Sequence, residues 1–254
     1  MILTIDIGNT RTKWGIFAAG AEFTGELKLY GVSLNADFNE APQAWRGCSR
    51  AVLCNVAGEQ IGQRVRAALQ ALNIPLTEVK ASSQACGVHN RYDQPEKLGV
   101  DRWAAVIAAW QHYHQPCVVV SAGTAVTIDA LTRDESGQGV FLGGMILPGI
   151  RLMQQSLLDA TAGIKESMGD WQDFPTNTAN ALYTAAMTAA AGNVKGMAAR
   201  LQNISGVLPI VIVSGGDAEP LAECLLGTIG MVNNLVIADN LVLQGLLLLE
   251  KASR

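Results

Sequence analysis

The sequence has few charged residues and no segment in which charges of one sign accumulate. Only 16% of its 254 residues are charged, and the formal net charge at pH 7 is −4. A protein that binds nucleic acid electrostatically needs a basic patch, so we expect no nucleic-acid partner. Apolar residues make up 49% of the chain, which predicts a compact globular protein with a sizeable core.

The chain also lacks the signatures of metal centres, disulfide frameworks and membrane spans. Its five cysteines are scattered, odd in number and without C-x-x-C spacing, and its three histidines are too few for a zinc site. Such thiols are typical of a reducing compartment. The apolar runs are too short to span a bilayer, and Ile2 to Ile7 is too short for a signal sequence. We therefore expect a cytoplasmic protein with no membrane partner.

A strand that ends in a polar turn opens the sequence. Ile2 to Ile7 is largely apolar and β-branched, which predicts a strand covered on both faces, and Trp14 to Phe17 predicts a second strand. Gly8 to Lys13 would then be a hairpin turn in which glycine, hydroxyl and amide groups surround backbone N–H donors. Such a concavity suits a phosphate, and Asp6 can hold a hydrated Mg²⁺. The Asp-x-Gly-Asn-Thr pattern alone is equally compatible with a plain polar hairpin.

The same pattern returns 115 residues later, where 117–129 is again a buried strand, a Gly-Thr turn and a second strand. The repeat aligns Ser121 with Asp6, Gly123 with Gly8, Thr124 with Asn9 and Thr127 with Thr12. Together with a Gly-Gly turn after 209–213, it predicts a duplicated α/β fold. We expect an N-terminal half at 1–115 and a C-terminal half at 116–254, with ATP in the cleft between them.

The rest of the chain alternates strands, helices and loops. Further strands are expected at 22–29, 51–56, 75–79, 141–146 and 209–213. Helices are expected at 59–72, 101–113, 150–158, 177–201 and 241–250, the last of them amphipathic. The polar stretches 82–97 and 162–175 are expected to be loops, and loops as long as the first are often functional.

Five motifs, in this order, resemble those of the type III pantothenate kinases. They are Asp6–Thr10, Gly99–Arg102, Ala122–Thr127, Asn177–Thr178 and Gly215–Ala218. That family belongs to the superfamily of acetate and sugar kinases, Hsp70 and actin, so the resemblance implies a duplicated RNase H-like (actin-like ATPase) fold. It covers nearly the whole chain, and Leu98–Arg102 following Tyr92 is its most specific part.

The resemblance also implies an activity, ligands and residue roles. A homodimer would phosphorylate pantothenate with ATP, the first step towards coenzyme A, and Asp101 would be the catalytic base. The implied ATP-binding residues are Asp6, Ile7, Gly8, Asn9, Thr10, Arg11, Thr12, Lys13 and Thr124, with Asp6 also holding Mg²⁺ through water. The implied pantothenate-binding residues are Tyr92, Gly99, Val100, Asp101, Arg102 and Thr178.

Two positions depart from the family pattern. Many members have aspartate where this chain has Ser121, and that carboxylate helps to bind a monovalent cation, K⁺ or NH₄⁺. A serine hydroxyl is a weaker cation ligand, so we expect the cation requirement to be weakened here. Ala185 stands where the family usually has glycine.

Each candidate residue also has a simpler structural explanation. Asp101 could cap its helix, Tyr92 could be a half-buried loop aromatic, and Thr178 could be an N-cap. Gly215 and Gly216 could simply end a strand. Asp129, in the second hairpin, could face a metal or merely the solvent.

Two functional alternatives remain open at this level. Another small-molecule kinase or phosphatase of the superfamily would share both phosphate turns but would not need Leu98–Arg102. A regulatory protein of the same fold is the second alternative, because some relatives were first described as accessory factors for transcription. The sequence has no helix-turn-helix, so such a protein would act by binding a ligand or a partner.

Overall fold

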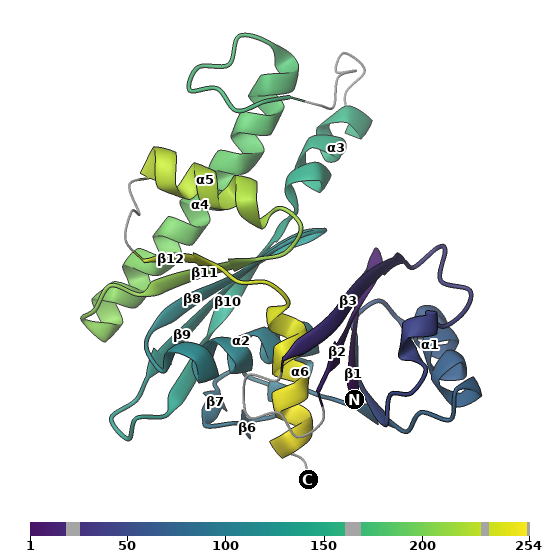
Figure 1. The fold of residues 1–254 in the computed structure, drawn as a ribbon. Helices are drawn as coiled ribbons and strands as arrows, with labels where there is room; N and C mark the ends of the chain where they lie inside the picture. Colours follow the sequence, from purple (N-terminus) through teal and green to yellow (C-terminus); the bar gives the residue numbers. More distant parts are fainter. Residues whose placement is uncertain (19–25, 161–168, 230–233, 253–254) are drawn as a thin grey trace. The chain divides into compact units, whose positions relative to one another are not determined.

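The computed structural model describes residues 1–18, 26–160, 169–229 and 234–252, which form two compact units (Figure 1). Unit 1 comprises Met1–His114, Gln138–Phe141 and Asn240–Arg254, and unit 2 comprises Gln115–Gly137 and Leu142–Asp239. Two late segments, 138–141 and 240–254, therefore belong to the unit that contains the N-terminus, whereas the sequence analysis assigned them to the C-terminal half.

Unit 1 is built on a five-stranded sheet in the order β3-β2-β1-β4-β5. Its central strand β1 (Ile2–Ile7) runs antiparallel to β2 (Arg11–Phe17) and parallel to β4 (Arg50–Asn55). The edges are β3 (Leu27–Leu34) and β5 (Leu76–Glu78). Every residue of β1 is buried, as the apolar run predicts for a strand covered on both faces.

Most of the strand predictions for this sheet are confirmed. The first hairpin has a shorter turn than the predicted Gly8–Lys13, because β2 already begins at Arg11. The predicted strand 22–29 lies largely outside the described residues, and β3 follows it from Leu27 to Leu34.

Three helices belong to unit 1: α1 (Glu59–Ala71), α2 (Val100–Tyr113) and α6 (Leu241–Ala252). α1 packs its apolar stripe on the β1 side chains Leu3, Ile5 and Ile7 in one core. Because side chains alternate along a strand, Thr4 and Asp6 point to the opposite face. On that face, the sheet is contacted by α2 and α6.

α6 is not the amphipathic helix predicted for 241–250. Its residues from Gly245 to Glu250 are all buried, so it is enclosed on nearly every side. A side chain at Gly245 would collide with the carbonyl oxygen of Ala104 on α2, so the two helices meet at this glycine. The buried carboxylate of Glu250 pairs with Arg50 at 2.9 Å.

The segment 82–97 is not the continuous loop predicted from its polarity. It contains a small hairpin of β6 (Gln84–Ala85) and β7 (Val88–Asn90), and β7 pairs with the start of β10 (Gly139–Pro148). Short 3-10 turns occur at Pro95–Lys97 here and at Gln43–Trp45 earlier in the unit. The prediction failed because strands of two or three residues carry no periodicity.

Unit 2 repeats the sheet topology of unit 1. Its strands lie in the order β12-β11-β8-β9-β10, with β8 (Cys117–Ala122) antiparallel to β9 (Ala125–Arg133) and parallel to β11 (Ile210–Ser214). The outermost strand is β12 (Leu235–Ile237). The second sheet has seven strands in all, and its five strands β8 to β12, numbered within their unit, have the same order 3-2-1-4-5 as the first sheet. This agreement confirms the predicted duplication of an α/β fold.

Helices α3 (Ile150–Ala160), α4 (Thr178–Ser205) and α5 (Ala218–Ile229) complete unit 2. Alanines of α4 such as Ala190 and Ala191 are fully buried in the core, where their small side chains permit close packing. The predicted helices 150–158 and 177–201 are confirmed, whereas α5 and β12 were not predicted. The expected loop 162–175 lies mostly outside the described residues, and its remainder has no regular secondary structure.

The two hairpins show that one pair in the predicted repeat is wrong. Asp6 pairs with Lys13 across the first hairpin, and Ser121 pairs with Thr127 across the second. Thr127 is therefore the counterpart of Lys13 and not of Thr12. The reason is that the second turn is one residue shorter: Gly8 N–H bonds to the carbonyl of Arg11, but Gly123 N–H bonds to that of Ala125.

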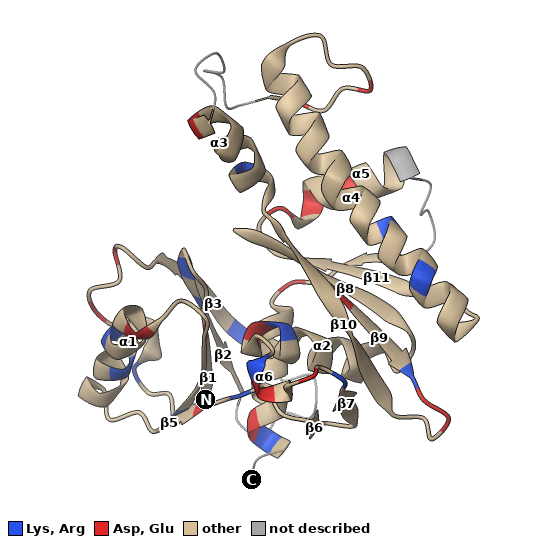
Figure 2. Cartoon of the chain, turned by 180° about the vertical axis from the view of Figure 1, so that it is seen from behind, with Lys and Arg blue, Asp and Glu red and all other residues tan. Residues whose placement is uncertain are grey.

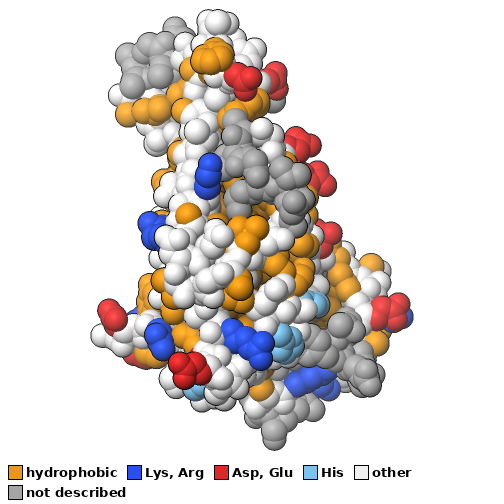
Figure 3. All heavy atoms as spheres, turned by 90° about the vertical axis from the view of Figure 1, so that its left-hand side faces the viewer, with side chains coloured by type: hydrophobic (Ala, Val, Ile, Leu, Met, Phe, Trp, Pro, Cys, Tyr) orange, Lys and Arg blue, Asp and Glu red, His pale blue; other side chains and the backbone are white. Residues whose placement is uncertain are grey.

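The surface agrees with the low charge of the sequence. Figure 2 shows that basic and acidic residues are scattered along many elements, and no helix or strand of the described residues gathers charges of one sign. Hydrophobic side chains are exposed on the face drawn in Figure 3. Among the described residues, no helix is both long enough and apolar enough to cross a membrane.

Candidate active site

The turn of the first hairpin is narrow and open to solvent. Gly8 N–H donates to the carbonyl of Arg11 at 3.0 Å, and a side chain at Gly8 would begin only 3.3 Å from that oxygen. The turn's next side chains, Asn9, Thr10 and Arg11, are all exposed, whereas Ile7 is buried in the core. The exposed residues are therefore the ones that a phosphate could reach.

Asn35, which the sequence analysis missed, supports this turn from behind. Its amide donates to the carbonyls of Gly8 at 2.7 Å and Asn9 at 3.2 Å, and its backbone N–H donates to the carbonyl of Thr10. In a planar trans peptide the C=O and the following N–H point in opposite directions. The N–H groups of Asn9 and Thr10 therefore point away from Asn35, which is the arrangement of an anion-binding turn.

Thr12 and Lys13 have different environments within the same motif. Thr12 is fully buried, and its hydroxyl donates to Asn35 at 2.8 Å. Lys13 is half-buried opposite Asp6 on the neighbouring strand. Thr12 thus stabilises the turn from inside, while Lys13 supplies positive charge next to the carboxylate.

Asp6 is a buried carboxylate, 8% exposed, on the sheet face opposite α1. The Cys54 thiol, on the parallel neighbour β4, donates to its Oδ1 at 3.3 Å. Burial and the negative charge of Asp101 raise the pKa of Asp6 to about 6, although Lys13 and the thiol partly oppose this. Burial and the nearby carboxylate in turn raise the pKa of Cys54 well above its ordinary value.

α2 packs on β4, the strand next to Asp6, and the negative charge of Asp101 contributes to the raised pKa of Asp6. Unit 1 therefore places the start of α2 near the phosphate turn. Two neighbouring carboxylates, one near the end of a buried strand and one in the first turn of a helix, form a favourable place for a cation. Among the described residues, no group of three or more His, Cys, Asp or Glu side chains could enclose a metal. A divalent ion here would therefore need oxygens from water and ligand.

Asp101 lies in the first turn of α2, but Gly99 and not Asp101 occupies the N-cap position. Its Oδ1 accepts a hydrogen bond from the N–H of Arg102 at 2.8 Å, which fixes the carboxylate's orientation. A side chain at Gly99 would lie only 2.7 Å from that same oxygen. The φ of Gly99, −53°, suits any residue, so a larger residue here would act by displacing the Asp101 carboxylate and not by straining the backbone.

Tyr92 and Arg102 lie side by side near the start of α2. The Arg102 guanidinium carbon is 6.0 Å from the centre of the Tyr92 ring, and Phe141 stacks on the ring with 6.4 Å between centroids. Arg102 is buried although it is charged, and Val100 next to it is half-buried. The simple reading of Tyr92 as a half-buried aromatic is accurate, but the ring also has a cation beside it.

In unit 2, glycines bring backbone segments together around the second turn. A side chain at Gly149 would collide with the carbonyl of Gly123, and one at Gly215 with the carbonyl of Ala122. Gly149 N–H donates to the carbonyl of Thr124 at 2.9 Å, and the Thr124 side chain is exposed. Gly215 has a φ of +106°, which favours glycine, so it does more than end a strand.

The partners of Ser121 on the two neighbouring strands, Thr127 and Ser214, both carry hydroxyls, whereas those of Asp6 are a lysine and a cysteine. The Ser121 Oγ lies 3.5 Å from that of Ser214, which donates to the carbonyl of Val120 at 3.3 Å. Asp129 is 1% exposed, so the idea that it faces solvent is wrong.

Thr178 is the exposed first residue of α4 and not its N-cap. The cap is Asn177, whose side chain accepts from Asn180 N–H at 2.9 Å. The N-cap explanation of Thr178 is therefore wrong. Its predicted contact with pantothenate, like the contact of Thr124 with ATP, stays a prediction.

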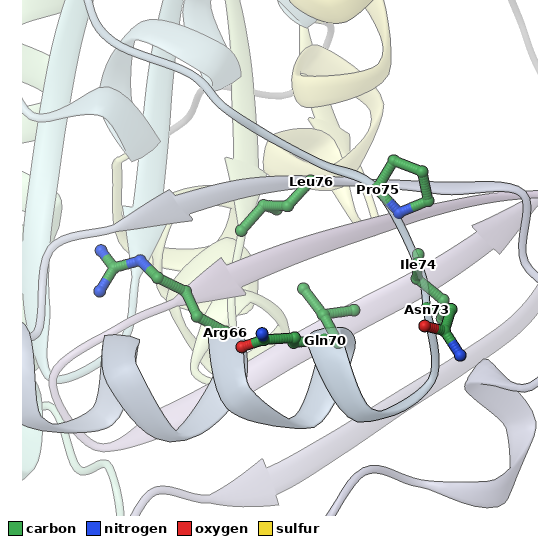
Figure 4. A pocket seen from close by; sticks show the side chains of 7 residues that line it. Arg66, Gln70, Asn73, Ile74, Pro75 and Leu76 are labelled. Atoms are coloured by element: carbon green, nitrogen blue, oxygen red, sulfur yellow. The ribbon is translucent and has the colours of Figure 1, made fainter.

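One pocket lies away from all of these residues, between α1 and β5 (Figure 4). It is lined by the last turns of α1 and the segment 73–76, and it contains no predicted site residue. Its charged group, Arg66, is already engaged by Glu59 and Glu78. We assign it no role.

Comparison with known proteins identifies the family. The sequence model of the type III pantothenate kinases matches residues 2–200. A type III pantothenate kinase from Methylobacillus flagellatus is 43% identical over 98% of each chain, and one from Nitrosospira multiformis is 39% identical over 99% of this chain and 91% of its own. A solved structure assigned to the Baf family of transcriptional activators, from Campylobacter jejuni, superimposes with a TM-score of 0.63 at 21% identity, covering 99% of this chain and 98% of its own. That structural likeness supports the fold, and the sequence matches confirm that the chain belongs to the type III pantothenate kinase family.

Proposed function

We propose that this protein transfers the γ-phosphoryl group of ATP to pantothenate, giving 4′-phosphopantothenate and ADP at the first step of coenzyme A biosynthesis. The observation that carries the proposal is the pairing, within unit 1, of an anion-binding turn at Asp6 with a carboxylate at Asp101. Phosphoryl transfer needs these two parts above all: groups that hold phosphate oxygens, and a base near the acceptor hydroxyl.

In the proposed reaction, the primary hydroxyl oxygen of pantothenate forms a bond to the γ-phosphorus while the bond to the β–γ bridging oxygen breaks. The hydroxyl proton passes to Asp101. One carboxylate oxygen is held by the N–H of Arg102, which leaves the second oxygen to receive the proton. Tyr92, Gly99, Val100 and Arg102 would line the acceptor pocket, and positioning by such groups is a large part of the rate.

ATP would bind at Asp6–Lys13, with the N–H groups of Asn9 and Thr10 directed at phosphate oxygens. The contribution of Thr124 and the location of ATP between the two halves stay predictions. A kinase of this superfamily uses a divalent metal, and we propose Mg²⁺ held through water by Asp6. The buried carboxylate fits that role, because Mg²⁺ keeps several waters and binds few protein groups. The metal would neutralise phosphate charge.

Three further properties belong to the same proposal. K⁺ or NH₄⁺ would still support activity, but more weakly than in relatives with aspartate at position 121. The protein would form a homodimer, for which the exposed Leu152 and Leu157 on α3 offer apolar surface. It would work in the cytoplasm, where its five cysteines, none of which forms a disulfide in the described structure, would remain reduced.

The decisive experiment incubates purified protein with ATP, MgCl₂ and KCl, and with pantothenate or a panel of other small hydroxy compounds. Phosphopantothenate, followed by mass spectrometry, should form well above the enzyme-free control and faster than any other product. If another hydroxy compound is preferred, the protein is a different kinase of the superfamily. If no compound is phosphorylated under several cations, the enzymatic proposal is wrong.

A regulatory role has no comparable support. The similarity to the Campylobacter jejuni protein is at 21% identity and shows the fold alone. The proposed enzyme activity is therefore the single function that we advance.

A further inference from the structure

Asn90 is a buried amide just before the segment that carries Tyr92. It ends β7 and is 8% exposed. Its Oδ1 accepts from Tyr92 N–H at 3.0 Å, and its Nδ2 donates to the carbonyls of Ser82 at 3.0 Å and Pro95 at 3.4 Å. Because one partner is a donor and two are acceptors, the contacts themselves fix which amide atom is oxygen.

These bonds join the two ends of the segment 82–97 at one point. Ser82 precedes the β6–β7 hairpin, and Pro95 begins the last turn before α2. The residues between Asn90 and Pro95, apart from Tyr92, are exposed and bury little surface that could hold them in place. The conformation of this part of the loop therefore depends on hydrogen bonds more than on packing.

Asn90 also helps to place Tyr92 next to Phe141 and Arg102. Asn90 is the register partner of Phe141 in the pairing of β7 with β10, and the N–H of Arg91 donates to the Phe141 carbonyl at 3.1 Å. Tyr92 follows directly, and its ring stacks on Phe141 with Arg102 on a ring face at 6.0 Å. Holding the Tyr92 backbone thus holds its ring next to Arg102.

We propose that Asn90 is a positioning residue for the acceptor substrate: its side chain holds Tyr92 against Phe141 and Arg102, so that the pantothenate pocket is formed before substrate binds. This inference rests on the proposed function, which assigns Tyr92 and Arg102 to that pocket. Asn90 itself touches neither substrate nor the reacting atoms. Its loss should raise the KM for pantothenate without changing the KM for ATP.

The test compares variants of Asn90 in the full-length enzyme. Asn90→Ala removes all three bonds, and a displaced positioning group should raise the pantothenate KM about tenfold or more. Asn90→Ser should restore much of the loss, because a serine hydroxyl can accept from the N–H two residues ahead. Asn90→Gln keeps the amide but moves it by one methylene, so it should raise the pantothenate KM even if Asn90→Ala does not fold.

Asn55→Ala is the matched control. The Asn55 side chain accepts from Ala57 N–H and donates to the carbonyl of Gly58, both at 2.9 Å, in the turn before α1. Its removal deletes a similar set of bonds far from Tyr92 in sequence, so it should lower Tm without raising the pantothenate KM. Equal effects of the Asn55 and Asn90 variants on Tm, with unchanged pantothenate KM in both, would overturn the positioning role.

Tyr92→Ala separates this inference from the proposed function. If it leaves the pantothenate KM unchanged, the assignment of Tyr92 to the pocket is wrong. If it raises that KM while Asn90→Ala and Asn90→Gln leave it at the wild-type value, the pocket is correct and the role of Asn90 is wrong. We expect the pantothenate KM to rise in Tyr92→Ala and in Asn90→Ala, and to return towards the wild-type value in Asn90→Ser.

Discussion

Asp6 and Ser121 occupy equivalent positions in two sheets of the same strand order, yet they have different surroundings. Each is the second-to-last residue of the central strand of its unit. Asp6 lies between Lys13 and Cys54 on the neighbouring strands, whereas Ser121 lies between Thr127 and Ser214. One site therefore contains a carboxylate, an ammonium and a thiol, and the other contains three hydroxyls.

The two units therefore share their strand order, but the charged side chains around Asp6 have neutral counterparts around Ser121. A buried carboxylate costs free energy unless a partner compensates it, and unit 1 combines such a carboxylate with Lys13 and a thiol donor. Unit 2 avoids that cost with neutral groups, and the hydroxyl of Thr127 has no hydrogen-bond partner among the described residues. We therefore expect the metal and the proton transfer to depend on unit 1, with the second turn contributing mainly backbone groups.

The largest effect should come from Asp101, the second carboxylate of unit 1. Asp101→Asn keeps the size and the acceptor for Arg102 N–H but removes the base, and loss of a general base costs about 10²- to 10⁴-fold in rate. We expect kcat to fall by that amount while Tm stays near the wild-type value. Retained activity per folded molecule with a lowered Tm would instead make Asp101 a structural residue of the helix start.

The next effect concerns stability and pH in the ligand-free protein. The pKa of Asp6 is raised to about 6 in the folded state, so its contribution to stability is greatest below pH 4 and is lost as the pH rises through 6. Asp6→Asn should therefore unfold with a free energy higher than wild type by up to about 3 kcal/mol at pH 8, and with no advantage at pH 4.

Urea unfolding at both pH values measures this difference, and Ser121→Ala is the control from unit 2. The change that Ser121→Ala makes in the free energy of unfolding should not depend on pH, because neither serine nor alanine has a side chain that titrates in this range. An Asp6→Asn protein that is less stable than wild type at pH 8 would show that the carboxylate is compensated more fully than we infer.

A smaller effect separates the two turns in nucleotide binding. Asp6→Asn removes the charge proposed to hold Mg²⁺, and a lost charge-assisted contact of at least about 1.4 kcal/mol weakens Mg²⁺-ATP binding tenfold or more. Ser121→Ala should weaken it less than about threefold on the same reasoning for a neutral hydroxyl. Calorimetry with both ligands decides this, because equal loss of ATP and pantothenate affinity would indicate a folding defect in β1.

The smallest effect should be a shift in cation response at Ser121. Wild type should be activated by K⁺ or NH₄⁺, and Ser121→Asp should move the activation curve to lower concentration. Initial rates are measured against KCl, with ionic strength held constant by the salt of a bulky organic cation. A flat wild-type curve would mean that the cation site is lost, and a steep curve unchanged in Ser121→Asp would mean that position 121 never belonged to it.

The sequence by itself determined the central strands, most helices and the family. Ile2–Ile7 and Cys117–Val120 are continuous buried runs, and apolar periodicity marks Glu59–Ala71, so these elements follow from local residue pattern. The motifs at Asp6 and Asp101 could be recognised for the same reason, because each is a contiguous stretch of residues.

Only the tertiary structure decided the groups that support those motifs. Asn35 reaches the phosphate turn from 23 residues beyond Thr12, and Cys54 reaches Asp6 from a parallel strand 48 residues away. Nothing in the residues next to Asn35 or Cys54 indicates these partners, since the contacts exist only after β-strands pair. The one-residue difference between the two turns was hidden for a related reason: turn length depends on which backbone groups bond across the hairpin, and an alignment without gaps cannot register it.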